Sequence, residues 1–319
     1  MKFCEGFHEV GDALRGGVVA IGNFDGLHRG HQALFQKALS VANGRQSSAG
    51  VLTFSPHPSK VLAPHLAPPM ILTPDEKRAG IARAQIDVCV FEPFDANFAR
   101  MTPEAFAEDI LVKGLQVSGV VVGQDFSFGH KGAGKVKDLR RMLEVHNVSV
   151  HVVEPVMESG LVCSSSKIRQ FILEGRMESA ALLLGRPYRL TGTVRDGDAR
   201  GRRMGIPTAN LETQRELLPR LGVYATWARL QNGQVYASVT NIGLRPTFNG
   251  EGTRIEVHLL DYEGDLYGQP VEVEFVTHLR EEKRFSGVEE LRAQIDADIE
   301  SAREHLRATP AVSEEPQTT

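Results

Sequence analysis

The stretch VVAIGNFDGLHRGHQALFQKAL, residues 18–39, decides the fold of the first part of the chain. Its apolar start, Val18 to Ile21, predicts a buried parallel strand, and Gly22 and Gly26 mark a tight turn after it. Apolar residues then recur at helical spacing, so we expect a helix from near Arg29. The turn therefore lies at the carboxyl end of a strand, which is where open α/β sheets bind their ligands.

The start of this expected helix has the features of an anion-binding site. A helix N-terminus offers unpaired N–H groups and a partial positive charge. His28 and His31 lie three residues apart here, so both can face one bound phosphate, and Gly30 leaves the backbone open to close approach. Alternatively, the histidines only cap the turn or bind a metal with too few partners. The stretch matches neither G-x-G-x-x-G nor a P-loop, so it indicates neither a dinucleotide fold nor a P-loop enzyme.

Length, charge and cysteine content limit the class of protein. A chain of 319 residues favours two domains. Its 36 basic and 40 acidic residues give a net charge of −4, which argues against a dedicated nucleic-acid surface. Three cysteines without C-x-x-C spacing favour neither a disulfide framework nor a zinc site. We expect a cytoplasmic protein, because the sequence shows neither a signal peptide nor an apolar run long enough to cross a membrane.

Strands and helices alternate along the first half of the chain. Residues 1–17 read as a polar lead-in. Buried strands are predicted at residues 18–21, 50–54, 88–91, 119–122 and 148–153. Helix starts are predicted at Thr73 and Thr102, and a further helix over 136–146. This alternation predicts an α/β domain with a parallel, Rossmann-like sheet that is covered on both faces.

A change of pattern at Gly185 marks the predicted domain boundary. Beyond it, short strands separated by turns predict a small closed antiparallel β-barrel, with a hairpin at Asn232-Gly233. Residues 287–306 show helix periodicity, and we interpret their apolar stripe as packing against the barrel. The predicted domains are therefore 1–185 and 186–307, and the polar tail 308–319 is expected to be disordered.

A cluster of hydroxyl and basic side chains opens another predicted helix. The segment Ser164-Ser165-Ser166-Lys167-Ile168-Arg169 can hold β- and γ-phosphates through hydrogen bonds and charge. The alternative is an ordinary serine N-cap followed by solvated basic residues. Taken alone, the segment fits this alternative better.

Elements in both halves of the chain resemble one known family. GNFDGLHRGH (22–31) resembles the signature of the nucleotidyltransferase superfamily. Together with VGQDFSFG (122–129) and SSSKIR (164–169), it resembles the adenylyltransferase half of the bacterial bifunctional riboflavin kinase/FMN adenylyltransferase family, although Ser166 stands where that family has threonine. GDARGRRMGIPTANL (197–211), EVHLLDY (256–262) and LREEKRF (279–285) resemble flavokinase elements, with Ile206 in place of the usual phenylalanine. The resemblance covers about residues 15–305.

The resemblance implies two activities. The N-terminal domain would convert FMN and ATP to FAD and pyrophosphate, and the barrel would convert riboflavin and ATP to FMN and ADP. His28 and His31 would act as catalytic residues in the first domain. Its nucleotide contacts are expected from Gly22, Phe24, Gly30, Asp125, Ser164, Ser165 and Arg169. Its flavin contacts are expected from Phe54 and Phe126.

In the barrel, the resemblance assigns Thr208 and Asn210 to Mg²⁺ and to the nucleotide phosphates, and Gly201 to the nucleotide. Glu256 would accept the proton of the riboflavin 5′-hydroxyl. Alternatively, a glutamate that alternates with apolar neighbours on a strand only faces solvent. Flavin contacts in the barrel are expected from Arg280 and Phe285. Both steps would need Mg²⁺, with ATP as co-substrate.

The expected partners are the small molecules riboflavin, FMN and ATP, with no nucleic acid and no membrane. One rival interpretation is a different nucleotidyltransferase, acting for example on phosphopantetheine or a choline-type phosphate, which would leave the barrel without a purpose. A second rival is a non-catalytic flavin- or nucleotide-binding sensor. The intact set of histidine, threonine, asparagine and glutamate argues against this sensor.

Overall fold

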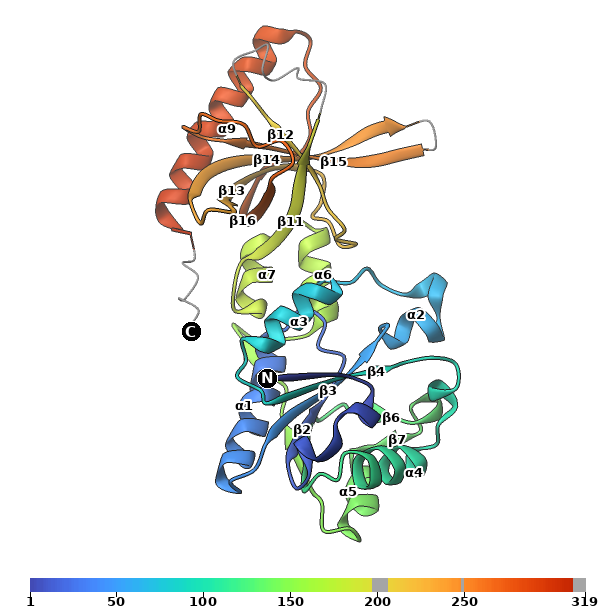
Figure 1. Cartoon of the computed structure of the whole chain (residues 1–319). Helices are drawn as coiled ribbons and strands as arrows, with labels where there is room; N and C mark the ends of the chain where they lie inside the picture. The colour runs from blue at the N-terminus through green and yellow to red at the C-terminus, as the bar shows by residue number, and fades with distance from the viewer. Residues whose placement is uncertain (197–205, 248–249, 312–319) are drawn as a thin grey trace. The chain divides into compact units, whose positions relative to one another are not determined.

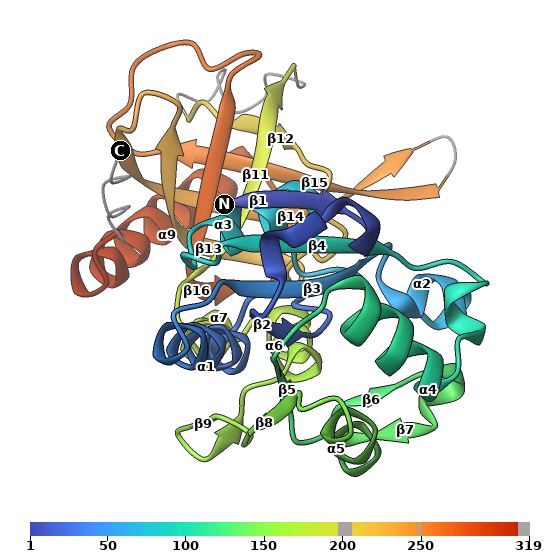
Figure 2. The ribbon, with the colours of Figure 1, turned by 60° about the horizontal axis from the view of Figure 1, so that its bottom comes forward.

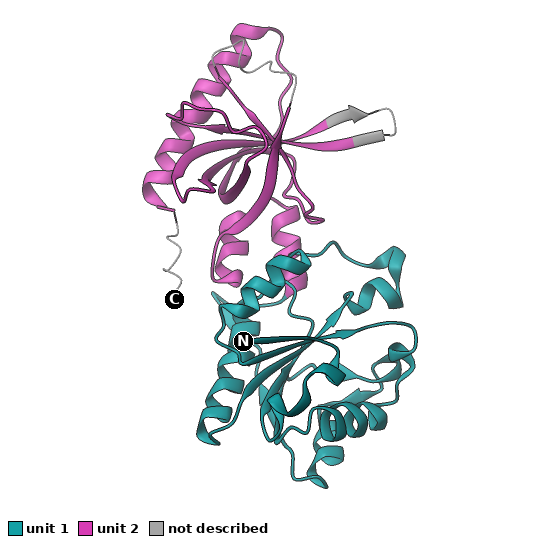
Figure 3. Cartoon of the chain, in the orientation of Figure 1, with its two compact units in different colours: residues 1–164 teal, residues 165–319 magenta. Residues whose placement is uncertain are grey.

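The computed structural model describes residues 1–196, 206–247 and 250–311, with the backbone alone at 245–247 and 250–251 (Figure 1). The chain forms two compact units, residues 1–164 and 165–319 (Figure 3).

The first unit is built on a six-stranded sheet in which every pair of neighbours is parallel. In spatial order its strands are β1 (Lys2–Glu5), β4 (Val88–Pro93), β3 (Ala49–Ser55), β2 (Val18–Ile21), β5 (Gly119–Gly123) and β8 (Ser149–Val153). The predicted parallel sheet is thus confirmed. The polar lead-in was wrong in part, because β1 forms the edge beside β4; only Cys4 of its four residues is buried, so the strand has no apolar run.

Helices cover both faces of this sheet (Figure 2). Because side chains alternate along a strand, Val18 and Ala20 belong to one core cluster with α1 (Arg29–Gly44) and α3 (Pro74–Ala82). Val19 and Ile21 belong to the other, with η5 (Phe106–Gly114) and α5 (Val136–Glu144). Shorter elements complete the unit: η1 (Phe7–Glu9), η2 (Gly11–Leu14), α2 (Pro58–Leu62), η3 (Pro64–Leu66), η4 (Phe98–Arg100), α4 (Pro103–Ala105), β6 (Ser127–Phe128), η6 (His130–Gly132), β7 (Gly134–Lys135), β9 (Met157–Glu158) and β10 (Leu161–Val162).

Strand β2 is the point where the winding of the sheet reverses. The chain leaves β2 for β3 and β4 on one side, and later returns to place β5 and β8 on the other side. In open α/β sheets this reversal opens a crevice at the carboxyl ends of the two adjacent strands. The turn after β2 and the loop after β5 therefore meet at the ligand-binding edge.

The second unit contains a closed antiparallel barrel of six strands, as predicted. In the order in which they pair, the strands are β11 (Tyr188–Arg195), β12 (Ala209–Glu212), β15 (Gly250–Leu259), β14 (Val235–Thr247), β13 (Gly222–Leu230) and β16 (Pro270–Arg280). Gly233, with φ of 83°, lies in the predicted hairpin turn between β13 and β14. The unit also contains α6 (Ser165–Leu173), α7 (Met177–Leu184) and the C-terminal helix α9 (Val288–Ala308).

Helices α6 and α7 belong to the same compact unit as the barrel. The backbone N–H of Arg220 donates to the carbonyl of Ile172 over 3.2 Å, and Gly175 lies against the rings of Tyr224 and His278. The predicted boundary at Gly185 coincides with the left-handed residue that ends α7, and as a functional boundary it stays a prediction. The predicted disorder of the tail also stays a prediction, because residues 312–319 lie outside the described part.

Candidate active sites

The two histidines of the first unit lie at the start of α1. His28 is the N-cap, and its Nδ1 accepts the backbone N–H of His31 over 3.3 Å. The two rings are stacked, with centroids 3.6 Å apart. Because Nδ1 is an acceptor, the proton of a neutral His28 ring is on Nε2. Helix capping therefore uses Nδ1 of His28, and Nε2 is the donor nitrogen of the neutral ring.

The turn before the histidines is packed around Phe24. Its ring is fully buried, and it contacts His31 edge-on at 5.2 Å and Phe35 at 4.8 Å. A Cβ atom at Gly22 would lie 3.0 Å from two atoms of the Phe24 ring, so a larger residue there would press on the ring. The ring of Phe24 thus supports His31 from the core, and its nucleotide contact stays a prediction.

Asp25, which the sequence analysis passed over, ties this turn to a distant segment. Its buried carboxylate accepts the N–H groups of Ile71, over 3.0 and 3.1 Å, and of Leu72, over 3.1 Å. Burial lowers the pKa of Lys77 to about 8, whereas the charge of Asp25 acts in the opposite direction. The segment at Ile71 and Leu72 is therefore fixed against the turn by hydrogen bonds from two backbone N–H groups to a carboxylate.

A second segment passes beside the start of α1. A Cβ atom at Gly30 would lie 3.0 Å from Cε1 of His28 and 3.3 Å from the carbonyl oxygen of Cys163. Arg29 forms an ion pair with Glu158 of β9 over 3.3 Å. Through these contacts the segment from Glu158 to Cys163 lies beside the start of α1. Ser164, the next residue, is the last one of the first unit.

Of the other residues predicted for the first site, some lie at the same edge of the sheet and two lie on α6, after the first unit ends. Asp125 is exposed just beyond β5. Phe54 and Phe126 are half-buried and are joined by successive ring contacts through Phe98, Phe106 and Phe128, with centroid separations of 5.4 to 6.3 Å. Ser165 and the buried Arg169 belong to α6 in the second unit. Gly201 lies outside the described residues.

In the barrel, one cavity of about 330 Å³ brings together five predicted residues, a volume typical of small-molecule sites. One comes from the segment that leads into β12, one each from the strands β12, β15 and β16, and one from the loop before α9. The five residues that line the cavity are Thr208, Asn210, Glu256, Arg280 and Phe285.

Strand register places the predicted base beside the predicted magnesium ligand. Asn210 on β12 is the cross-strand partner of Glu256 on β15, and Asn241 on β14 faces Glu256 from the other side. Arg254 forms an ion pair with Glu256 over 2.9 Å, and only 19% of the Glu256 side chain is exposed. Glu256 is therefore part of the cavity wall and not a simple solvent-facing residue.

The sequence analysis missed several residues of this wall, including Asn241, Arg254 and Asp298. Only the pairing of β14 with β15 reveals that Asn241 faces Glu256. Arg254 lies two positions before Glu256, hence on the same face of the strand, and this spacing was the available signal.

A smaller cavity of about 80 Å³ adjoins the first one. Thr208 lines both, and Pro207, Tyr262, Asp265 and Tyr267 line only the smaller one. The segment 208–210 therefore lies between the two cavities: Ala209 lines the smaller one, Asn210 the larger one, and Thr208 both.

The apolar stripe of α9 has two uses. Ile299, Ala302 and Leu306 pack against the barrel, as predicted. Leu291 and Ile295, one to two turns earlier, line the large cavity instead. The interpretation of the whole stripe as barrel packing was thus right only for its second half.

Comparison with known proteins assigns both units. The FAD synthetase family model matches residues 11–167, and the riboflavin kinase model matches residues 184–306. A bifunctional riboflavin kinase/FMN adenylyltransferase of Listeria monocytogenes is 39% identical over 90% of this chain and 91% of its own. The protein of the same description from Escherichia coli K12 is 36% identical over 97% and 99%.

The chain belongs to the bifunctional riboflavin kinase/FMN adenylyltransferase family.

A solved structure supports the same fold for this family member. A crystal structure that bears the name of a macrolide-efflux protein, from Streptococcus pneumoniae, superposes with a TM-score of 0.86 at 33% identity over 94% of this chain and 98% of that chain. That name refers to transport, whereas both family models and the named relatives are of enzymes. Within the described ranges, the chain has no helix that is long and apolar enough to cross a membrane.

Proposed function

We propose that the barrel of this family member transfers the γ-phosphoryl group of ATP to riboflavin, giving FMN and ADP. The observation that carries this proposal is the pairing of Asn210 with Glu256 inside the large cavity, with Thr208 shared between the two cavities. Riboflavin in the larger space and ATP reaching in from the smaller one would meet at these three side chains.

Glu256 would act as the general base. As the 5′-hydroxyl oxygen of riboflavin bonds to the γ-phosphorus, the bond to the β-phosphate oxygen breaks and Glu256 takes the hydroxyl proton. The ion pair with Arg254 engages Oε2 of Glu256 and so fixes the orientation of the carboxylate. Such a transfer depends mainly on positioning and on neutralised charge, which a cavity of converging polar groups provides.

The residues present fit Mg²⁺ as it is bound in phosphoryl-transfer sites. Magnesium takes few protein ligands there, prefers oxygen, and completes its shell with water and substrate phosphates. The hydroxyl of Thr208 and the side-chain carbonyl of Asn210 would hold it, and the ion would neutralise phosphate charge. No cluster of three His, Cys, Asp or Glu side chains that could hold a metal occurs among the residues that the structure describes.

The first unit would carry out the second step. An oxygen of the FMN phosphate bonds to the α-phosphorus of ATP, and pyrophosphate leaves. His28 and His31 would donate to the α-phosphate beside the N–H groups at the start of α1. Ser164 would hold the leaving pyrophosphate, and Gly22, Phe24, Gly30 and Asp125 would complete the nucleotide contacts. The expected nucleotide contacts of Ser165 and Arg169 stay a prediction.

The chain of aromatic rings between Phe54 and Phe126 supports a flavin site near the same sheet edge. An isoalloxazine ring is planar and stacks favourably on aromatic side chains. The three cysteines are buried and free, which fits a reducing compartment, and we place both reactions in the cytoplasm.

One incubation tests both steps. The protein is mixed with riboflavin, ATP and Mg²⁺, flavins are separated by chromatography, and ADP and pyrophosphate are assayed separately. We expect FMN to appear first with equal ADP, then FAD with equal pyrophosphate, and neither product in excess EDTA. Pyrophosphate release without FAD, or ADP release without FMN, would contradict the proposal.

A further inference from the structure

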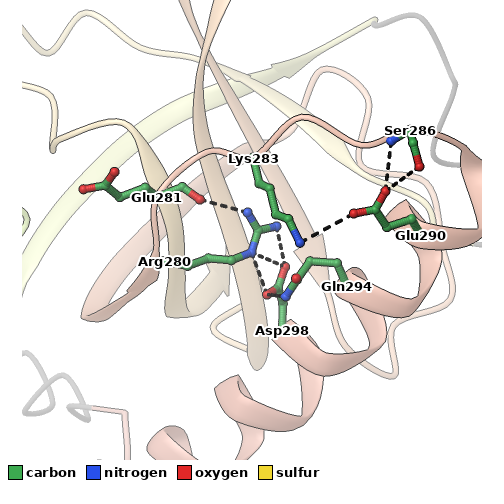
Figure 4. A network of polar contacts seen from close by, with 7 residues as sticks. All are labelled: Arg280, Glu281, Lys283, Ser286, Glu290, Gln294 and Asp298. Atoms are coloured by element: carbon green, nitrogen blue, oxygen red, sulfur yellow. Dashed lines mark hydrogen bonds and ion pairs between the residues drawn. The ribbon is translucent and has the colours of Figure 1, made fainter.

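Strand β16 and helix α9 are joined by a partly buried ion pair at the large cavity (Figure 4). Nε of Arg280, the last residue of β16, donates to Oδ1 and Oδ2 of Asp298 over 2.8 and 3.1 Å. Nη2 of Arg280 donates to Oδ2 over 2.7 Å, and Nη1 to the carbonyl of Glu281 over 2.9 Å. The guanidinium therefore has little freedom to turn.

The carboxylate of Asp298 is held as tightly as the guanidinium. Its side chain is only 6% exposed, and Gln294, one turn earlier on α9, donates to Oδ1 over 3.0 Å. Burying a carboxylate is costly unless it is paired, and apolar residues at such a place stabilise a fold at least as well. Simple attachment of α9 to the barrel thus does not account for this pair.

The position of the pair on α9 points to a role in the cavity. Asp298 adjoins Ile299, which packs on the barrel, and lies one turn after Ile295, which lines the cavity. Asp298 and Arg280 line the cavity as well, and the guanidinium carbon of Arg280 lies 5.8 Å from the centre of the Phe285 ring. The pair thus stands where the helix changes from core packing to cavity wall.

A second set of contacts fixes the other end of the segment 281–287. Lys283 pairs with Glu290 over 3.6 Å, and Glu290 accepts the N–H and hydroxyl of Ser286 over 2.9 and 2.7 Å. Lys283 also lies 5.6 Å from the centre of the Phe285 ring. The segment that carries Phe285 is therefore anchored to α9 on both sides.

We propose that Asp298 is a positioning residue of the riboflavin pocket. It holds the planar guanidinium of Arg280, and with it the segment of Phe285, as one wall of the cavity. Because its charge is matched by Asp298, this wall suits the uncharged flavin ring and not a phosphate. The inference rests on the proposed kinase function of this cavity, and it makes α9 a determinant of riboflavin affinity.

The test compares D298N, R280A and the double variant in the full chain, with separate KM values for riboflavin and ATP. Losing a buried charge-assisted contact predicts a KM for riboflavin about ten- to hundredfold higher in D298N, with the KM for ATP within about twofold of the parent. D298N should add nothing to R280A, because both act through one contact. D261N is the matched control, since it removes the exposed pair of Asp261 with Arg303 on the same helix.

Melting temperature and FAD formation from added FMN show whether each variant is folded. If D298N fails to fold, R280K keeps the charge but loses the two-pronged contact, and it should raise the KM for riboflavin in the same way. An unchanged KM for riboflavin, or equal rises in both KM values that follow the loss of melting temperature, would overturn the proposal. A parent protein that makes no FMN would instead contradict the kinase function itself.

Discussion

The two candidate sites are built in opposite ways. In the first unit, the histidines and the glycines between Gly22 and His31 follow one strand without interruption, and the start of one helix orients them. In the barrel, Asn210, Glu256 and Arg280 come from three different strands and Asp298 from the C-terminal helix. The first site therefore depends on one local turn, and the second on the register of the closed barrel.

Removing the predicted base, Glu256, should give the largest loss of activity, and it should affect only the reaction of the barrel. E256Q keeps the shape of the side chain but cannot accept the proton, so FMN formation should fall by about 10² to 10⁴. FAD formation from added FMN should stay at the parent level. The control is E212Q, which changes an exposed glutamate on β12, the strand of Asn210, and should leave both steps intact. Unchanged FMN formation in E256Q would move the base elsewhere.

The complementary experiment changes His31 in the first unit. Because one preorganised donor is lost, H31A should lower FAD formation by about 10² to 10³, while FMN accumulates from riboflavin. K37A, on the exposed side of the same helix, should behave like the parent. If the histidines served only the helix start, H31A would keep the backbone N–H that the His28 cap uses, and FAD would still form at the parent rate.

A smaller change sharpens the claim that local backbone geometry builds the first site. A Cβ atom at Gly30 would press on Cε1 and Nδ1 of His28, at 3.0 and 3.1 Å. G30A should therefore displace the ring by a few tenths of an ångström and lower FAD formation about tenfold, with FMN formation intact. G44A is the matched control, because nothing lies within 4 Å of a Cβ atom at that end of α1. Equal FAD rates in G30A and G44A would show that the position of His28 is not critical.

The same contrast explains what the sequence could predict. The strand, the turn and the start of α1 follow from local periodicity and glycine placement, so His28 and His31 could be located from residues alone. Asn241 and Asp298 could not, because strand register places the first opposite Glu256 and the packing of α9 places the second beside Arg280. Strand β1 was missed since an edge strand with polar residues lacks the apolar signal.

The central claim is that each unit performs one step of a two-step synthesis, and mixing the two inactive variants tests it most directly. E256Q and H31A are incubated with riboflavin, ATP and Mg²⁺, first separately and then in one tube, and FAD is measured. Separately, E256Q should leave riboflavin unchanged and H31A should stop at FMN. Together they should make FAD, because FMN released by the barrel of H31A can be adenylylated by the first unit of E256Q. A mixture that makes no more FAD than H31A alone, although E256Q converts added FMN at the parent rate, would contradict the account.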